Sequence, residues 1–310
     1  MAEKKIKTVA VIGPTASGKT GLACGIASRI DCEIIGADSM QIYKGFPIAS
    51  AAPTAEEKGD IPHHLIEILE PTERFSVADY IRLAGDRIRD INARGRLPLL
   101  VGGTGLYIDS LLSGMVFTEE EGNEDVRERL EAEFSRVGGA EMLARLAATD
   151  PKTAARLHEN DRKRIIRALE IYELHGITAD EMNARTVSEP SPYEALKIGI
   201  TYRDRETLYR RIDERVGLML ERGLIEEARA ARSALGTTAV QAIGHKELYP
   251  YLDGEISLDE AAENLKRATR RYAKRQLTWF RRDPSVKWIY ADEETEPTAA
   301  ALEMINEFLD

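Results

Sequence analysis

The sequence has few cysteines, few aromatic residues and no long apolar run. Cys24 and Cys32 are its only two cysteines among 310 residues, too few for a disulfide framework or, by themselves, for a zinc site. No apolar run approaches the roughly 18 residues that a membrane-spanning helix needs. The apolar stretch 8–13 is also too short for the apolar region of a signal peptide. We therefore expect a soluble, cytoplasmic protein.

Basic residues are in the minority. Lys and Arg total 43 against 53 Asp and Glu, which gives a formal net charge of −10 at pH 7. This balance excludes a generally basic surface for binding nucleic acid, but it is compatible with a local basic patch. The hydrophobic content of 43% is enough for a substantial core, and 310 residues allow one large domain or two of moderate size.

Short apolar runs alternate with helical patterns. The runs lie at 8–13, 32–39, 97–103, 197–202 and 287–292. Segments 21–30 and 75–95 have apolar residues at helical spacing, and 204–282 is again mainly helical in pattern. Uninterrupted apolar runs between helices are typical of strands buried on both faces. The pattern predicts an α/β fold with a parallel sheet flanked by helices.

The stretch 118–188 interrupts this alternation. It carries four amphipathic helical patterns and no apolar run of the strand type. We interpret it as a helical insertion domain between two strands of the sheet. The flanking parts, 1–117 and 189–310, then form one catalytic core that ends in helices.

The strongest motif is GPTASGKT, which matches G-x-x-x-x-G-K-[S/T] between an apolar run and a helical one. Its residues are Gly13, Pro14, Thr15, Ala16, Ser17, Gly18, Lys19 and Thr20. In such a P-loop, typical of nucleotide-binding proteins, backbone N–H groups and the following helix N-terminus bind phosphate oxygens. Lys19 adds a positive charge, and the Thr20 hydroxyl can ligate Mg²⁺. The motif predicts a phosphate site without indicating which phosphate compound binds.

The second nucleotide-binding signal is missing. P-loop NTPases usually hold Mg²⁺ with an aspartate after a second apolar strand, but the run at 97–103 ends in Gly102-Gly103-Thr104. Asp38 lies at the end of a different run, 32–39, at the edge where ligands bind in open α/β sheets. It suits a general base or a metal-linked carboxylate, and a turn or cap role is the alternative. A small-molecule kinase using ATP and a non-catalytic RNA-binding P-loop module both stay open.

Eight blocks then carry a resemblance to a known family. They are GPTASGKT, GADSMQIYKG, DIPHHLIEILEP, FSVADY, LLVGGTGLYIDSLLSG, RALEIYELHG, QAIGHKELYPYLDGEIS and TRRYAKRQLTWFRRD. In this order they resemble the tRNA dimethylallyltransferases (tRNA isopentenyl transferases). The resemblance implies a P-loop NTPase-like core that transfers a dimethylallyl group from dimethylallyl diphosphate to N6 of the adenosine at tRNA position 37, next to the anticodon. No nucleoside triphosphate is consumed, and the P-loop would hold the diphosphate leaving group.

The resemblance also implies catalytic roles. Asp38 would accept the proton of the adenine N6 amine, and Thr104 would lie near the reacting centre. Thr15, Lys19 and Thr20 would hold the diphosphate and its Mg²⁺. An electron-poor allylic centre needs a stabilised leaving group more than a strong nucleophile.

Arg211 would contact the diphosphate in the same resemblance. Arg210 beside it and Arg215 four positions on leave the choice of arginine open. A solvated charge on a helix is the alternative for Arg211.

The family's tRNA-contacting segments correspond to three parts of this chain. Their residues are Asp38, Ser39, Met40, Gln41, Lys163, Arg164, Ile165, Ile166, Arg167, Gln241, Gly244, His245 and Lys246. A further stretch, 266–282, holds eight basic and no acidic residues. It could contact RNA or acidic helices of the same chain. The target adenine would have to flip out of the anticodon loop to reach Asp38. We expect a monomer whose partners are the tRNA anticodon stem-loop and dimethylallyl diphosphate.

Overall fold

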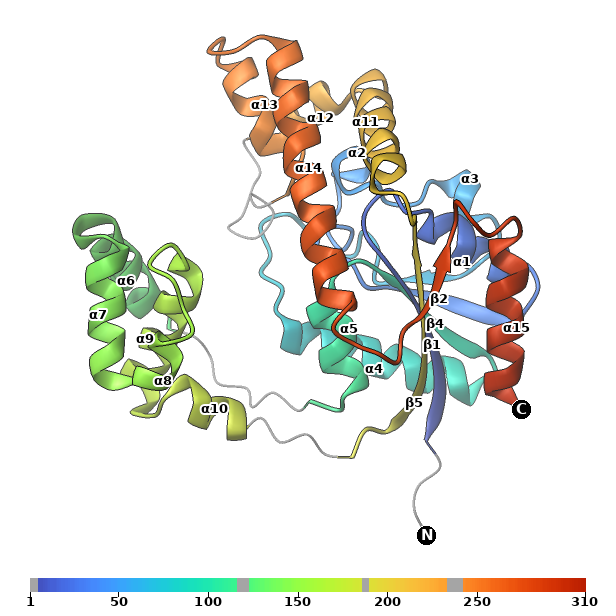
Figure 1. The fold of residues 1–310 in the computed structure, drawn as a ribbon, viewed down its shortest axis with the longest axis horizontal. Helices are drawn as coiled ribbons and strands as arrows, with labels where there is room; N and C mark the ends of the chain where they lie inside the picture. Colours follow the sequence, from blue (N-terminus) through green and yellow to red (C-terminus); the bar gives the residue numbers. More distant parts are fainter. Residues whose placement is uncertain (1–4, 116–122, 186–189, 233–241) are drawn as a thin grey trace. The chain divides into compact units, whose positions relative to one another are not determined.

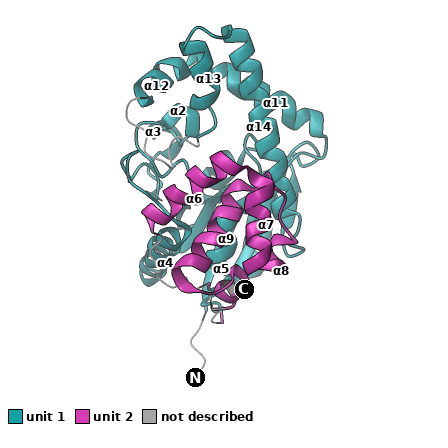
Figure 2. Ribbon diagram, turned by 90° about the vertical axis from the view of Figure 1, so that its left-hand side faces the viewer, with its two compact units in different colours: residues 1–114, 191–310 teal, residues 115–190 magenta. Residues whose placement is uncertain are grey.

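The computed structural model describes residues 5–115, 123–185, 190–232 and 242–310. The chain forms two compact units, which Figure 2 colours separately. The first unit is Met1–Gly114 with Ser191–Asp310, and the second is Met115–Pro190. Each unit has a hydrophobic core of its own.

The first unit is built on a six-stranded sheet (Figure 1). Its strands are β1 (Ile6–Ile12), β2 (Cys32–Gly36), β3 (His63–His64), β4 (Leu97–Gly102), β5 (Tyr193–Thr201) and β6 (Lys287–Tyr290). The order is β3-β2-β4-β1-β5-β6, and each described pairing is parallel. The predicted α/β fold class with a parallel sheet is confirmed.

Helices cover both faces of this sheet. The described helices of this unit, some of which lie away from the sheet, are α1 (Lys19–Ala27), α2 (Pro47–Ser50), α3 (Ala55–Lys58), α4 (Val77–Ala93), α5 (Gly105–Leu112), α11 (Arg205–Glu221), α12 (Leu224–Ala231), α13 (His245–Leu252), α14 (Leu258–Phe280) and α15 (Pro297–Leu309). Val9 and Val11 of β1 pack with α1 and α15, whereas Ala10 and Ile12 pack with α4 and α5. Because both sets are buried, β1 reads as a continuous apolar run.

β3 and α15 are among the elements of the sheet region that the sequence analysis did not predict. β3 contains only His63 and His64, too short a segment to show strand periodicity. α15 follows the last strand and buries Ala301 and Ile305 against α1 and the sheet. The predicted strand 32–39 ends earlier, at Gly36, which leaves Asp38 beyond the sheet in a loop.

The segment predicted to be mainly helical, 204–282, contains α11 to α14. α14 is 23 residues long and packs against α13, α11 and α5 (Figure 1). Near its beginning, Ala261 and Leu265 share a core with α11, α12 and α13. Near its end, Phe280 joins the core of the sheet. One helix therefore connects the helical cluster to the end of the sheet.

The second unit is helical. It contains α6 (Glu124–Val137), α7 (Gly139–Thr149), α8 (Pro151–Ala154), α9 (Arg162–His175) and α10 (Ala179–Arg185). The predicted insertion, 118–188, falls within it. Buried Glu170 of α9 is paired with Arg127 and Arg167, so its charge is compensated. Among the described helices of either unit, none has the length and apolar composition of a bilayer span.

Candidate active site

The P-loop connects β1 to α1 at the carboxyl edge of the sheet. Gly13 has φ 155°, and a Cβ there would lie 2.3 Å from the carbonyl oxygen of Ile200, so only glycine fits. Gly18 is left-handed and caps the N-terminus of α1. The hydroxyl of Ser17 is buried and has no hydrogen-bond partner among the described residues. The loop thus offers a helix N-terminus and an unused hydroxyl donor, which suit a phosphate oxygen.

Lys19 is held over this loop. Its Nζ donates a hydrogen bond to the Pro14 carbonyl oxygen at 2.7 Å. Burial lowers the pKa of Lys19 to about 8; the Asp38 charge raises this pKa and the Arg215 charge lowers it. A bound anion would favour the protonated ammonium.

Asp38 and Thr104 follow the adjacent strands β2 and β4. The Thr104 backbone N–H donates to the Ala37 carbonyl at 3.1 Å, and the Thr104 hydroxyl accepts from the Ser39 N–H at 3.0 Å. One carboxylate oxygen of Asp38 accepts from the Met40 N–H at 2.9 Å. Among the described residues the other oxygen has no hydrogen-bond donor, so it is available to accept a proton.

Tyr272 of α14 is a site neighbour that the sequence analysis did not single out. Burial and then the nearby Asp38 charge raise the pKa of Tyr272, and the neighbouring Thr104 side chain acts in the opposite direction. The tyrosine lies inside the basic stretch 266–282, and no local pattern there distinguishes it from its charged neighbours.

Two arginines of α11 face the P-loop region. Arg211 Nε donates to the Ala16 carbonyl oxygen at 3.4 Å. Arg215 lies one turn further along and is partly buried. Burial lowers its pKa overall, although the nearby Asp38 charge acts in the opposite direction. Arg210 instead lies near Glu214 at 3.9 Å on the exposed face. The geometry thus brings Arg211 and Arg215 to the site and leaves Arg210 outside it.

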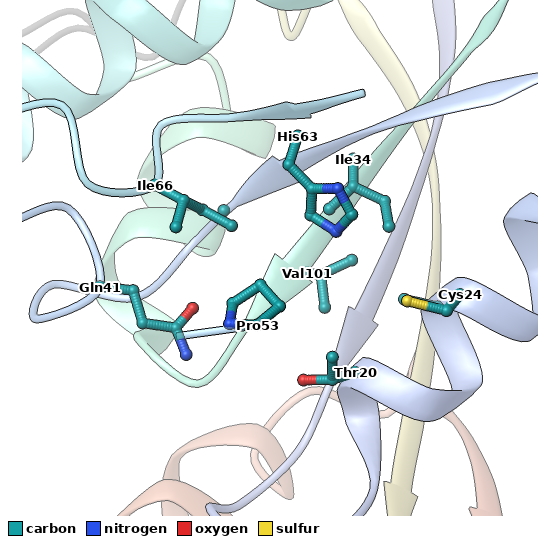
Figure 3. A pocket seen from close by; sticks show the side chains of 10 residues that line it. Thr20, Cys24, Ile34, Gln41, Pro53, His63, Ile66 and Val101 are labelled. Atoms are coloured by element: carbon teal, nitrogen blue, oxygen red, sulfur yellow. The ribbon is translucent and has the colours of Figure 1, made fainter. Parts of the chain in front are cut away.

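Oxygen donors for a cation are present but few. Thr20 lines a small pocket with Cys24 of the same helix and Val101 of β4 (Figure 3). The described residues contain no group of three or more His, Cys, Asp or Glu side chains that could hold a metal ion. Mg²⁺ is commonly bound by one or two protein oxygens together with substrate phosphates. The Thr20 hydroxyl fits that kind of site, with the substrate phosphates supplying further oxygens.

Comparison with known proteins identifies the family. The IPP transferase family model matches residues 41–283. A tRNA dimethylallyltransferase of Bacillus velezensis is 49% identical over 290 residues, which cover 93% of this chain and 92% of that protein. The chain belongs to the tRNA dimethylallyltransferase family. The resemblance carried by the eight sequence blocks is confirmed.

Solved structures of this family have the same fold. The tRNA isopentenylpyrophosphate transferase of Bacillus halodurans superimposes with a TM-score of 0.73 at 44% identity, over 98% of this chain and 97% of that one. A eukaryotic dimethylallyltransferase acting on tRNA gives a TM-score of 0.81 at 27% identity, over 98% and 79%. The predicted P-loop NTPase-like core is confirmed for this family member.

The first predicted tRNA segment of this dimethylallyltransferase family member, 38–41, begins with Asp38 itself. Ser39 and Met40 hold the site through their backbone amides. The Gln41 amide donates to the carbonyl oxygens of Ser50 and Ala51 at 3.2 and 3.0 Å. Gln41 therefore ties the site loop to the end of α2.

The second predicted segment lies on α9 in the helical unit. Lys163, Arg164 and Arg167 are exposed, and Arg167 is paired with Glu170 at 2.9 Å. Ile165 and Ile166 are buried in the core of that unit. A direct side-chain contact to tRNA is therefore wrong for the two isoleucines, because they occupy the inward face of the helix.

The third predicted segment is divided. Gln241 lies outside the described residues. Gly244 caps α13, and Lys246 is half-exposed beside Glu247. His245 is buried, so a direct tRNA contact of its side chain is corrected to a structural one.

His245 is part of a polar cluster around Glu227. Its Nε2 lies 2.8 Å from the Glu227 carboxylate, and its ring meets Phe46 edge-on at 5.1 Å between centroids. The same carboxylate accepts hydrogen bonds from the backbone N–H groups of Ile48 and Ala49 at 2.8 and 2.9 Å. The cluster holds α12 and α13 against α2.

Proposed function

We propose that the protein transfers a dimethylallyl group from dimethylallyl diphosphate to N6 of the adenosine at position 37 of tRNA, next to the anticodon, and releases diphosphate. One observation carries the proposal. A complete P-loop lies beside β4, which ends at Gly102 and is followed by Gly103 and Thr104, while the carboxylate at this edge, Asp38, follows the neighbouring strand β2. This arrangement supports diphosphate as the leaving group held by the P-loop. It also supports Asp38 as a proton acceptor, in the place of the carboxylate that holds the metal ion of an ATPase. The family membership supports the same reaction.

The leaving-group side of the site is cationic. Lys19, Arg211 and Arg215 lie around the P-loop, whose backbone N–H groups at the start of α1 would donate to a bound phosphate. As the allylic C–O bond breaks, negative charge grows on the diphosphate, and these groups bind it more strongly than they bind the intact substrate. Mg²⁺, bound at Thr20 and the diphosphate, would neutralise part of that charge.

The acceptor side is organised around Asp38. The N6 nitrogen forms the new C–N bond while the C–O bond of the donor breaks, and the N6 proton passes to the free Asp38 oxygen. Thr104 holds this carboxylate in place through the Ser39 amide. A flipped adenine is required, because a stacked base cannot reach a group at the sheet edge.

The tRNA would lie on basic surfaces. On α14 the exposed basic side chains are Arg267, Arg271, Lys274 and Arg275, with Arg281 and Arg282 just beyond its end. Among the described residues none of the six forms an ion pair with an acidic side chain. Arg270 is different, because it pairs with Asp213 of α11. Phosphate contacts depend on local potential, so such a stripe can bind RNA on a chain of net charge −10.

The remaining parts of the proposal concern the assembly and its place in the cell. One chain carries Asp38, Thr104 and the P-loop, so a monomer suffices for the reaction. A tRNA substrate is consistent with a cytoplasmic enzyme. Lys163, Arg164 and Arg167 of the helical unit provide a second basic surface for the anticodon stem-loop.

A direct assay tests the reaction. The protein is incubated with radiolabelled dimethylallyl diphosphate, bulk tRNA and Mg²⁺ in the absence of ATP. We expect label in tRNA, and we expect Asp38→Asn to lower the transfer rate about 10²–10⁴-fold while pyrophosphate binding is retained. Strict dependence on ATP, or undiminished transfer by Asp38→Asn, would contradict the proposal; the former would favour the kinase.

A further inference from the structure

Gln276 of α14 joins two halves of the site. Its amide is buried, with 5% of the residue exposed. The amide oxygen accepts a hydrogen bond from the Thr15 N–H of the P-loop at 2.8 Å, and the amide nitrogen donates to the Gly103 carbonyl oxygen at 2.9 Å. A Cβ at Gly103 would lie 2.1 Å from that nitrogen, so glycine makes room for the amide.

We propose that Gln276 is a positioning residue that sets the separation between the bound diphosphate and the proton-accepting carboxylate. This inference rests on the proposed function. Thr15 belongs to the loop that holds the leaving group, whereas Gly103 precedes Thr104, which holds the segment of Asp38. Both contacts converge on one planar side chain, so neither half of the site can shift without straining a hydrogen bond.

Among side chains of this length, the amide satisfies both partners without a change of protonation. A carboxylate accepts hydrogen bonds and cannot donate to the Gly103 carbonyl, and a thioether neither donates nor accepts strongly. A protonated carboxylic acid, in contrast, has one donor and one acceptor oxygen, and so reproduces the glutamine pattern. The activities of Gln276→Glu and Gln276→Met should therefore depend differently on pH.

The end of α14 is anchored independently of Gln276. Trp279 Nε1 donates to the Asp109 carboxylate at 2.6 Å, and Lys197 bridges Asp109 and Asp283 at 2.8 Å to each. Phe280 is buried in the sheet core. Loss of the Gln276 amide consequently leaves the helix docked, and the variants can be assayed as folded proteins.

The test compares Gln276→Glu and Gln276→Met with the wild type in the transfer assay and in binding of Mg²⁺-pyrophosphate. We expect kcat to fall about 10–100-fold in both, as a displacement of about 1 Å can cost 10²-fold. We expect the pyrophosphate Kd to rise several-fold, with the KM for tRNA unchanged. As pH is lowered, the activity of Gln276→Glu relative to wild type recovers, because the carboxylic acid regains its donor; that of Gln276→Met stays flat.

Leu265→Ala is the matched control, since Leu265 lies on the same helix in the core shared with α12 and α13. We expect it to lower Tm without the loss of kcat or the pH-dependent recovery. Wild-type kcat and pyrophosphate Kd in both Gln276 variants would overturn the proposal. An equal loss of kcat in Leu265→Ala at equal Tm would overturn it as well, because the effect would then be structural. If the wild type transfers nothing, the proposed function fails, and an unchanged pyrophosphate Kd in both variants still decides against Gln276.

Discussion

The hydroxyl oxygen of Thr104 accepts a hydrogen bond from the backbone N–H of Ser39 at 3.0 Å. This contact joins the end of β4 to the loop after β2, and Asp38 is the residue immediately before Ser39. The position of the carboxylate thus depends on a side chain from the neighbouring strand end. The same side chain partly offsets the rise that burial causes in the pKa of the neighbouring Tyr272, so the tyrosine lies close to this contact.

Substitution of Thr104 should test this dependence. Thr104→Val removes the acceptor but keeps the shape of the side chain, and we expect kcat for transfer to fall at least about tenfold. The free energy of unfolding should fall by only about 1 kcal/mol, the usual contribution of one hydrogen bond. Thr104→Ser keeps the hydroxyl and should stay within about threefold of wild-type kcat. Equal kcat values in the two variants would show that the hydroxyl does not position Asp38.

Substitution of the two arginines that face the P-loop should weaken pyrophosphate binding, whereas substitution of the neighbouring Arg210 should not. Arg211→Ala and Arg215→Ala each remove a cation from the diphosphate site, and each should raise the Kd of Mg²⁺-pyrophosphate about 10–100-fold, the range of charge-assisted hydrogen bonds. Arg210→Ala removes a charge from the exposed face beside Glu214 and should leave that Kd unchanged. Calorimetry on the three variants measures the pyrophosphate Kd. A larger effect of Arg210→Ala than of the other two would show that the diphosphate binds on the opposite face of α11, and would contradict the placement given above.

The lowered pKa of Lys19 predicts a pH dependence of anion binding. In the free protein the ammonium loses its proton as pH rises through about 8, below the ordinary value of 10.5. A bound diphosphate stabilises the ammonium and raises this pKa, so binding takes up a proton above pH 8. Affinity should therefore fall with rising pH, by up to about tenfold per unit.

The control for this profile is Lys19→Met, which lacks the titrating group. Pyrophosphate ionises equally in both experiments, so the difference between the two profiles isolates Lys19. Kd is measured from about pH 6 to about pH 10. Parallel profiles over the whole range would rule out a lysine that titrates near pH 8.

The exposed basic stripe of α14 predicts the salt dependence of tRNA binding. Arg271→Ala with Lys274→Ala should weaken binding and flatten the log–log slope of affinity against salt by roughly 0.7–0.9 for each lost phosphate contact. Arg270→Ala is the control, because Arg270 pairs with Asp213 and should affect Tm more than the slope. Filter binding at several salt concentrations measures the tRNA affinity and its slope. An unchanged slope in the double variant would exclude these side chains from the RNA contact.

Local patterns in the sequence predict one part of the site. The P-loop is contiguous, and its glycines, lysine and threonine have their positions fixed by the turn between β1 and α1. Asp38 and Thr104 follow from the ends of two apolar runs, since parallel strands end at one edge of a sheet. These features require no knowledge of how the helices dock.

The contacts that depend on docking were not predictable in the same way. Gln276 meets Thr15 across 261 positions of sequence, and nothing near either residue indicates the other. The orientation of α11 decides between Arg210, Arg211 and Arg215, because three closely spaced arginines give no clear polar face. The basic stretch of α9 could have been divided by helical spacing, which places Ile165 and Ile166 on its buried face.

The three hydrogen bonds received by Glu227 have a consequence for recombination between family members. The carboxylate binds two backbone amides at the start of α2 and the ring of His245, which packs on Phe46. A chimera that takes α12 and α13 from another parent alters the partners of segment 46–49 unless that segment comes from the same parent. The natural unit of exchange is therefore discontinuous in the chain, and a crossover placed only by sequence order would divide it.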